Sequence, residues 1–277
     1  MLSRSRPVLV GSINNPQLPL EDELRRIAAE RFDFVDLTLE PPGAWPRRGE
    51  DIGRLLADLG LAAVGHTAYY LPIASPFPEL RERSRTLLQT AFETFAAAGI
   101  ALVNVHPDGM TRMFSQEEIR RRNAEAIARL AEDADERGCR LMVENLGTSF
   151  SRVDDLAPIL SASDKVGFHL DVGHAHMHRD HGQPNRTPML LAAFADRLAH
   201  VHLHDNLGEH DLHLPLGAGT IDWPEIARAL RRAGWDGTVT LEIFAPERAH
   251  LDTSHRLWRE WWQVAEPVGE GESETGR

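Results

Sequence analysis

The chain has 277 residues, 42% of them hydrophobic and 26% charged, and a formal net charge of −12 at pH 7. This length and apolar content allow a single domain with an ordinary buried core, and no apolar run reaches the ~20 residues that span a bilayer. The acidic charge opposes nonspecific binding to nucleic acid or to an anionic membrane surface. We therefore expect a globular protein with neither a membrane nor a nucleic acid as its partner.

Two residue types are nearly absent. Cys139 is the single cysteine, which excludes an internal disulfide and a thiolate metal cluster. Lys165 is the single lysine among the 30 lysine and arginine residues, so Schiff-base chemistry is not expected. The N-terminal segment MLSRSRPVLV lacks the apolar stretch and cleavage site of a secretory signal. These features together favour a cytoplasmic location.

Short apolar or β-branched runs alternate with longer amphipathic stretches along the chain. The runs, each a predicted strand, are Pro7–Ile13, Phe32–Leu39, Ala62–His66, Ala101–His106, Arg140–Glu144, Val166–Asp171, Ala199–His204 and Thr238–Phe244. The predicted helices lie near residues 20–31, 50–59, 77–98, 115–137, 152–162, 187–197, 223–233 and 253–264. Strict alternation of eight strands with eight helices is typical of an α/β fold whose parallel sheet closes into a (β/α)8 TIM barrel.

An open, doubly wound sheet is the alternative fold. Its dinucleotide fingerprint G-x-G-x-x-G is absent after the first predicted strand, which runs into GSINNP instead. We therefore expect one barrel domain over residues 1–268. The remaining residues, 269–277, are polar and glycine-rich, and are predicted to be disordered.

Six consecutive predicted strands end in a histidine or an acidic residue. These residues are His66, His106, Glu144, Asp171, His202 and Glu242, and His174 follows Asp171 three positions later. The carboxyl ends of barrel strands meet at one face, where TIM barrels carry their active sites. A lone strand-end histidine can equally be a hydrogen-bonded rim residue, but Glu144 and Glu242 stand among apolar residues and need a cation to offset their desolvation. Histidine and carboxylate without thiolate suits Zn, Mn, Co or Fe.

The seventh predicted strand presents several histidines. Alternation places His200, His202 and His204 on one face. We predict His202 as the metal ligand, His200 as a structural residue lower in the barrel, and His204 and Asp205 as residues that support the ligand or face the substrate.

The loop after this strand reads GEHDLHLPLGAGTIDW and contains Asp211 and His213, a second ligand-like pair. Aspartate and histidine are also common in ordinary surface loops, so this pair alone does not decide the chemistry.

Taken together, these motifs resemble the xylose isomerase-like TIM-barrel superfamily, which contains sugar epimerases, inosose dehydratase-type enzymes and endonuclease IV. The most specific segment, HVHLHDNLGEHDLHLPLGAGTIDW, is similar to the H-x-H-x-D-N…D-x-H-L-P-x-G-x-G-x-I-D run of members described as sugar phosphate isomerases/epimerases. The similarity extends from the third predicted strand to the eighth and is weaker over the first 60 residues.

The resemblance implies specific ligand sets. Sugar epimerases hold one divalent ion, often Mn, and the matching residues are Glu144, Asp171, His202 and Glu242. Members similar to endonuclease IV hold three zinc ions with five further ligands, which match His66, His106, His174, Asp211 and His213. The expected cofactor is therefore a divalent metal, Mn or Zn, as one ion or as many as three.

Some features depart from the family patterns. Tagatose- and psicose-type epimerases carry an arginine shortly after the strand-seven histidine, whereas the loop here reads DNLGEHD, so the resemblance does not extend to ketohexose specificity. Tyr69, three residues after His66, resembles a residue near the endonuclease site, but the Tyr-Tyr pair could equally wall a small-molecule pocket. The acidic chain lacks the electrostatic footprint of a DNA-binding enzyme.

The resemblance favours a divalent-metal-dependent isomerase or epimerase that acts on a sugar, a sugar phosphate or a related polyol by metal-assisted proton transfer. Glu144 and Glu242 are its expected general acid and base, His174 is expected to contact the substrate, and Tyr69, His204 and Asp205 are expected to bind it. The alternative function is a phosphoester hydrolase with a cluster of two or three metal ions. A third hypothesis is a barrel that keeps a metal only for stability. The sequence leaves the oligomeric state open, a homo-oligomer included.

Overall fold

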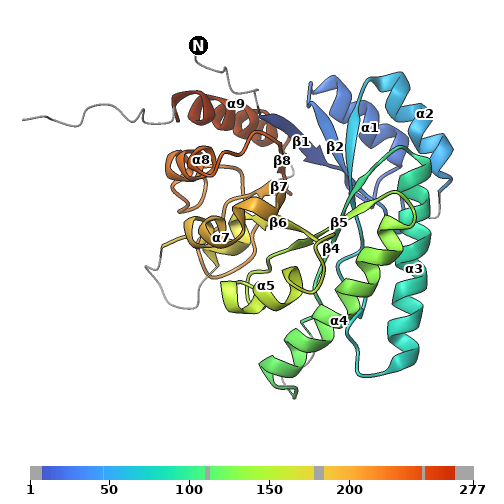
Figure 1. The fold of residues 1–277 in the computed structure, drawn as a ribbon. Helices are drawn as coiled ribbons and strands as arrows, with labels where there is room; N and C mark the ends of the chain where they lie inside the picture. Colours follow the sequence, from blue (N-terminus) through green and yellow to red (C-terminus); the bar gives the residue numbers. More distant parts are fainter. Residues whose placement is uncertain (1–7, 46, 110–112, 178–183, 245–246, 266–277) are drawn as a thin grey trace, which may run out of the picture.

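The computed structural model describes residues 8–45, 47–109, 113–177, 184–244 and 247–265. Eight parallel strands form a closed barrel in which each strand pairs with the next and β8 pairs with β1 (Figure 1). The strands are β1 (Leu9–Ile13), β2 (Phe34–Thr38), β3 (Ala62–His66), β4 (Leu102–Val105), β5 (Arg140–Glu144), β6 (Gly167–Asp171), β7 (Leu198–Leu203) and β8 (Thr238–Leu241). The predicted single-domain TIM barrel is confirmed.

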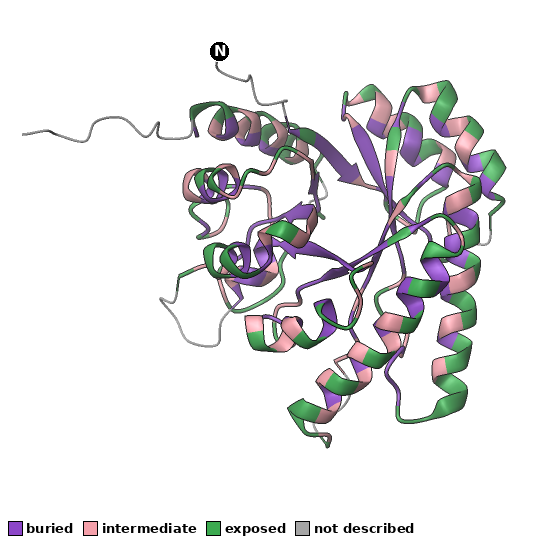
Figure 2. Ribbon diagram, in the orientation of Figure 1, coloured by how far each residue is buried: buried purple, intermediate pink, exposed green. Residues whose placement is uncertain are grey.

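Helices surround the barrel on its outside (Figure 1). They are α1 (Leu20–Ala29), α2 (Gly49–Leu59), α3 (Pro78–Ala97), α4 (Gln116–Asp135), α5 (Val153–Leu160), α6 (Val172–His176), α7 (Thr187–Phe194), α8 (Trp223–Arg232) and α9 (Ala249–Val264), with a 3-10 turn at Ala195–Arg197. Buried residues occupy the strands and the inward faces of the helices, and exposed residues lie outside (Figure 2). None of the helices within the described ranges is long and apolar enough to cross a membrane.

Local sequence signals explain several helix ends. Ser115 caps α4, because its hydroxyl accepts a hydrogen bond from the backbone N–H of Glu118 three residues later. Gly60 ends α2 in the left-handed conformation, with a φ of 66° that glycine adopts without steric cost. Asp222 caps α8 through the N–H of Glu225.

The structure refines several predicted boundaries. The strands β4, β7 and β8 end earlier than predicted, so His106, His204 and Glu242 lie just beyond the last strand residue. Helix α9 begins four residues before the predicted start at 253, and the short helix α6 was not predicted at all. The predicted disordered tail, 269–277, lies outside the described residues.

Side chains that point into the barrel change character along its axis. Phe34, Val64 and Met142 form a separate buried apolar cluster at the lower end. Two residues further along the same strands, the inward side chains are Asp36, His66 and Glu144, all of them buried. The register aligns Glu144 with His169 and Asp171 with His202, which brings polar side chains to a common level near the carboxyl ends.

Candidate metal centre

A cavity of about 980 Å³ opens at the carboxyl ends of the strands. Seven of the nine residues predicted as metal ligands line it: His66, His106, Glu144, His174, Asp211, His213 and Glu242. The remaining two, Asp171 and His202, are fully buried immediately beneath the wall. The nine side chains therefore converge on one end of the barrel.

The first donor group comprises Glu144, Asp171, His202 and Glu242. Nδ1 of His202 lies 3.0 Å from Oε2 of Glu242 and 3.8 Å from Oδ2 of Asp171. Donor atoms of Glu144, Asp171 and His202 all lie within 4.8 Å of one another. These residues come from the ends of β5, β6, β7 and β8, so neighbouring strands supply the whole group.

A second donor group shares Glu144 with the first. Its members, His66, His106 and Glu144, offer donor atoms within 4.8 Å of one another, and Nε2 of His106 lies 3.1 Å from Oε2 of Glu144. The amide of Asn104 donates a hydrogen bond of 2.7 Å to the same oxygen of Glu144 and fixes the orientation of this carboxylate.

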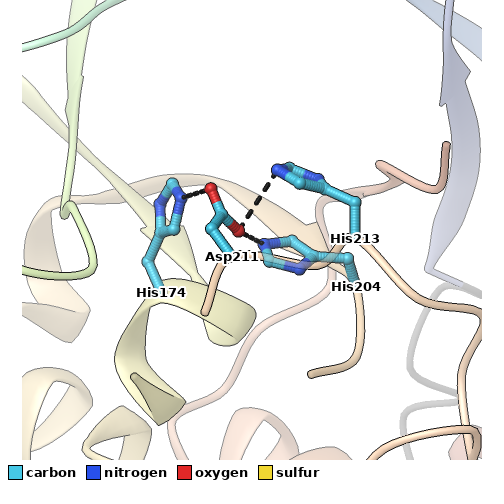
Figure 3. A group of neighbouring side chains, drawn as sticks. All are labelled: His174, His204, Asp211 and His213. Carbon is cyan, nitrogen blue, oxygen red and sulfur yellow. Dashed lines mark hydrogen bonds and ion pairs between the residues drawn. The ribbon is translucent and has the colours of Figure 1, made fainter. Parts of the chain in front are cut away.

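A third donor group lies beside the mouth and contains His174, His204, Asp211 and His213 (Figure 3). Asp171 begins α6 by accepting the backbone N–H of His174 at 2.6 Å, so a ligand of the first group positions one of the third. The loop after β7 folds back through paired hydrogen bonds between Asp205 and Leu214, and this return brings Asp211 and His213 over the barrel.

Electrostatic coupling sets the protonation of these groups. Burial alone raises the pKa of Glu144, but neighbouring histidines, His106 foremost, hold it well below its ordinary value. Burial likewise opposes the shift of Glu242, whose pKa His202 lowers to about 2. Burial lowers the pKa of His202, yet the carboxylates of Glu242 and Asp36 raise it well above its usual range. In the metal-free site the glutamates are therefore carboxylates and His202 holds a proton.

A buried layer beneath the donors was missed in the sequence. Oδ2 of Asp36 lies 2.6 Å from Nε2 of His202 and 3.4 Å from Nε2 of His200, and its Oδ1 lies 3.6 Å from Nδ1 of His66. Asp36 thus faces one ligand from each of two donor groups. The available signal is an acidic residue inside the apolar strand FVDLT, but Asp36 stands in mid-strand, whereas the ligands predicted from the strands stand at or near strand ends.

The predicted substrate contacts differ in their placement. Tyr69 is 70% exposed and lines the cavity, and its contact with a substrate stays a prediction. Asp205 is fully buried away from it, because its carboxylate accepts hydrogen bonds from the backbone of Gly217 and from the indole of Trp223, each at 2.8 Å. The carboxylate of Asp205 therefore holds the loop, and its contact with a substrate stays a prediction. His204 is also fully buried and lies off the cavity wall.

The residues present fit a divalent transition metal. The donors are imidazoles and carboxylates, the set that Zn and Mn accept. Oδ2 of Asp171 is buried without a hydrogen bond, and Nδ1 of His66 and of His106 are in the same condition. An unpaired carboxylate oxygen in a buried site is costly unless a cation binds it.

Comparison with known proteins identifies the family to which this chain belongs. A family model described as "Xylose isomerase-like TIM barrel" matches residues 24–261. The chain belongs to the xylose isomerase-like TIM-barrel family. Within this family the chain is 28% identical over 251 residues to "Probable endonuclease 4" of Symbiobacterium thermophilum, which covers 82% of this chain and 89% of that protein.

Two other relatives carry names from the isomerase side of the family. An "Inosose isomerase" of Bacillus velezensis is 26% identical over 201 residues, covering 68% of this chain and 65% of that protein. The crystal structure of a "D-tagatose 3-epimerase-like protein" superposes with a TM-score of 0.82 at 22% identity, covering 93% of this chain and 98% of the other. The latter likeness establishes the shared fold.

Proposed function

We propose that the protein is a divalent-metal-dependent isomerase or epimerase of a carbohydrate or related polyol. The observation that carries this proposal is the presence of two glutamates in one cavity, Glu144 at the end of β5 and Glu242 directly after β8, both held as carboxylates. Each is able to accept a proton from a carbon of a substrate placed between them.

The part of the cavity wall formed by β1, β2 and the segment after β1 suits an uncharged, hydroxyl-rich ligand. It carries the hydrogen-bonding side chains of Ser12, Asn14, Asn15, Gln17 and Thr38. Oγ1 of Thr38 is buried and makes no hydrogen bond within the protein, so a substrate hydroxyl is a suitable partner for it.

The charges of the lining disfavour a phosphorylated substrate. Its two arginines are already paired, Arg26 with Glu23 and Glu30, and Arg248 with Glu30. A phosphate group needs cationic donors, and the described part of the lining offers none that lacks a carboxylate partner.

The residues divide the chemistry among them. Glu144 and Glu242 would remove and return the proton at carbon. His174, whose Nδ1 is held 3.0 Å from the backbone oxygen of Asn145, would hydrogen-bond a substrate oxygen only where its Nε2 binds no metal ion. Asp171 and His202 complete the donor set beneath them. A divalent ion in this set supplies Lewis-acid polarisation of substrate oxygens.

Isotope exchange tests this function directly. The metal-reconstituted protein is incubated in D2O with a panel of ketoses, aldoses and inososes. The substrate among them should take up deuterium at a carbon next to its carbonyl group, as measured by NMR. Chelation of the metal and the Glu242→Gln substitution should each abolish incorporation, whereas Glu209→Gln, an exposed change in the β7–α8 loop, should not. Unchanged incorporation in the Glu242→Gln protein would remove this residue from the reaction.

A metal-cluster phosphoester hydrolase is the second candidate, favoured by the presence of all nine donors that match the three-zinc family members. In that reaction Glu144 would be the carboxylate shared between two ions. Vigorous cleavage of duplex DNA at abasic sites at physiological salt, lost in His106→Ala, would make the hydrolase the better description. We expect little cleavage, because the net charge of −12 opposes the phosphate contacts that hold DNA.

A further inference from the structure

His204 is the residue whose surroundings the proposed reaction leaves unexplained. Its side chain is fully buried, and neither ring nitrogen makes a hydrogen bond. A buried imidazole without hydrogen bonds is costly, because at least one nitrogen needs a donor or acceptor partner. His200 on the same strand shows the ordinary solution, since its two nitrogens pair with the hydroxyls of Thr238 and Thr240 at 2.6 and 2.9 Å.

The ring of His204 is directed at the third donor group. Its Nε2 lies 3.1 Å from Oδ1 of Asp171, in the first donor group, and 3.7 Å from Oδ1 of Asp211. Nε2 of His213 lies 3.2 Å from the same oxygen of Asp211. Nε2 of His174 lies 3.1 Å from the other oxygen, Oδ2. Figure 3 shows the three imidazoles arranged around this one carboxylate. One donor atom from each of the four residues lies within 4.8 Å of the others.

The backbone of β6 and α6 makes room for this ring. A Cβ atom added at Gly173 would lie 2.1 Å from Cε1 of His204 and 2.3 Å from its Nε2. Any side chain at position 173 would therefore displace the imidazole from the donor group. The ring also stacks on His213, with centroids 4.0 Å apart, so both rings present Nε2 to Asp211.

We infer that His204 is a fourth protein ligand of a zinc ion bound by His174, Asp211 and His213. Three imidazoles and one carboxylate complete a tetrahedral donor set that Zn²⁺ accepts. A site with four protein ligands is closed, whereas a catalytic zinc keeps a position open for water or substrate. This ion would therefore act as a clamp and would not activate water.

The consequence of a closed site is mechanical. The ligands come from α6, from the residue after β7 and from the far end of the β7–α8 loop, so the ion ties this loop to the barrel. The loop contains His213 with a φ of 45°, a left-handed conformation that a non-glycine residue keeps only when its surroundings hold it. The clamp would keep Asp211 and His213 at the wall of the substrate cavity.

A crystal structure of the zinc-loaded wild-type protein, with anomalous data at the zinc edge, tests the ligand assignment without any variant. We expect an anomalous peak with Nε2 of His204 about 2.0–2.1 Å away and no water in its coordination sphere. A peak bound by His174, Asp211 and His213 with a water in place of His204 would overturn the inference. So would a His204 ring that only bridges Asp171 and Asp211 as a proton donor, at hydrogen-bond distance from both.

Metal counting with a matched pair of variants gives a second test. His204→Asn should weaken the binding of one zinc ion by more than ~100-fold, beyond the loss expected for an outer-sphere partner, and should speed amide hydrogen exchange in residues 206–221. His200→Asn, which removes an equally buried imidazole from β7, should keep every zinc ion. Equal metal content in the two variants would contradict the assignment. These readouts do not depend on turnover, so they remain informative if the proposed isomerase activity is wrong.

Discussion

The lower and upper parts of the barrel interior are built from the same strands, but the lower part is lined by apolar side chains and the upper part by ionisable ones. On β2, Phe34 belongs to the apolar cluster at the bottom, and Asp36, two residues later, is buried among histidines. On β5, Met142 and Glu144 repeat this change. The lower part gains stability by excluding water, whereas the upper part holds ionisable groups whose desolvation opposes folding until cations bind. Substitutions in the two parts should therefore affect different properties.

The largest effect is expected at the bottom. Phe34→Ala should lower the free energy of unfolding by about 3–5 kcal/mol, because it removes a fully buried ring and leaves a cavity. Denaturant titration measures this loss. The number of bound metal ions should not change, and a variant that lost its metal while retaining its stability would break the division between the two parts.

At the mouth, Glu242→Gln should affect turnover. Turnover should fall by at least ~100-fold, the usual contribution of a general acid or base. The metal-free protein should also lose thermal stability at neutral pH, because the pKa of Glu242 is lowered to about 2 and its ionised form therefore stabilises the folded state. Steady-state kinetics and thermal melts in chelator give the two values. A large loss of stability with intact turnover would place Glu242 in the structural region.

Asp36 should show an intermediate behaviour, since it holds ligands without being one of the predicted nine. Asp36→Asn removes the negative partner of His202 and should weaken metal binding by about 10–100-fold, the range seen for carboxylates behind a ligating histidine. Asp33→Asn is the matched control, because Asp33 bonds the backbone N–H of Val10, one of the first residues of β1, and contacts no donor group. Competition with a chromophoric chelator measures both affinities, and equal values would deny Asp36 a positioning role.

The smallest effect concerns pH. Burial would lower the pKa of His213, but the carboxylate of Asp211 raises it to about 9. The ordinary histidine pKa is about 6.5, so this pair stabilises the metal-free protein below that pH and the contribution is lost as pH rises from there to about 9. Metal affinity should increase over the same window, because the ion displaces a proton. Plots of melting temperature against pH should therefore have opposite slopes with and without metal. Parallel slopes would show that the protonation of His213 does not determine both effects.

The sequence was sufficient for the barrel because periodicity and helix ends are local signals. The alternation of apolar strands with amphipathic helices predicted every strand and the order of the major helices. It could not predict α6, a five-residue helix whose N-cap is Asp171, because so short a segment has no measurable periodicity. The cytoplasmic location and the oligomeric state stay predictions.

The site was predicted less completely, for a physical reason. Strand-end position identified donors such as Glu144 and His202, because the carboxyl ends of barrel strands meet. The roles of Asp36 and Asp205 depend on which side chains face them across the barrel or across a loop, and chain spacing does not encode such contacts. Asp205 is an example, because its partner Trp223 follows 18 residues later.

The membership of Glu144 in two donor groups makes metal uptake a collective property of the mouth. An ion bound beside His66 and His106 would fix the carboxylate that a second ion beside Asp171 and His202 also requires. The entropic cost of ordering the Glu144 side chain is then met by the first ion alone. The first ion therefore raises the affinity for the second by linkage. Titration with metal should accordingly be sigmoidal, and partly filled molecules should be rare at any metal supply.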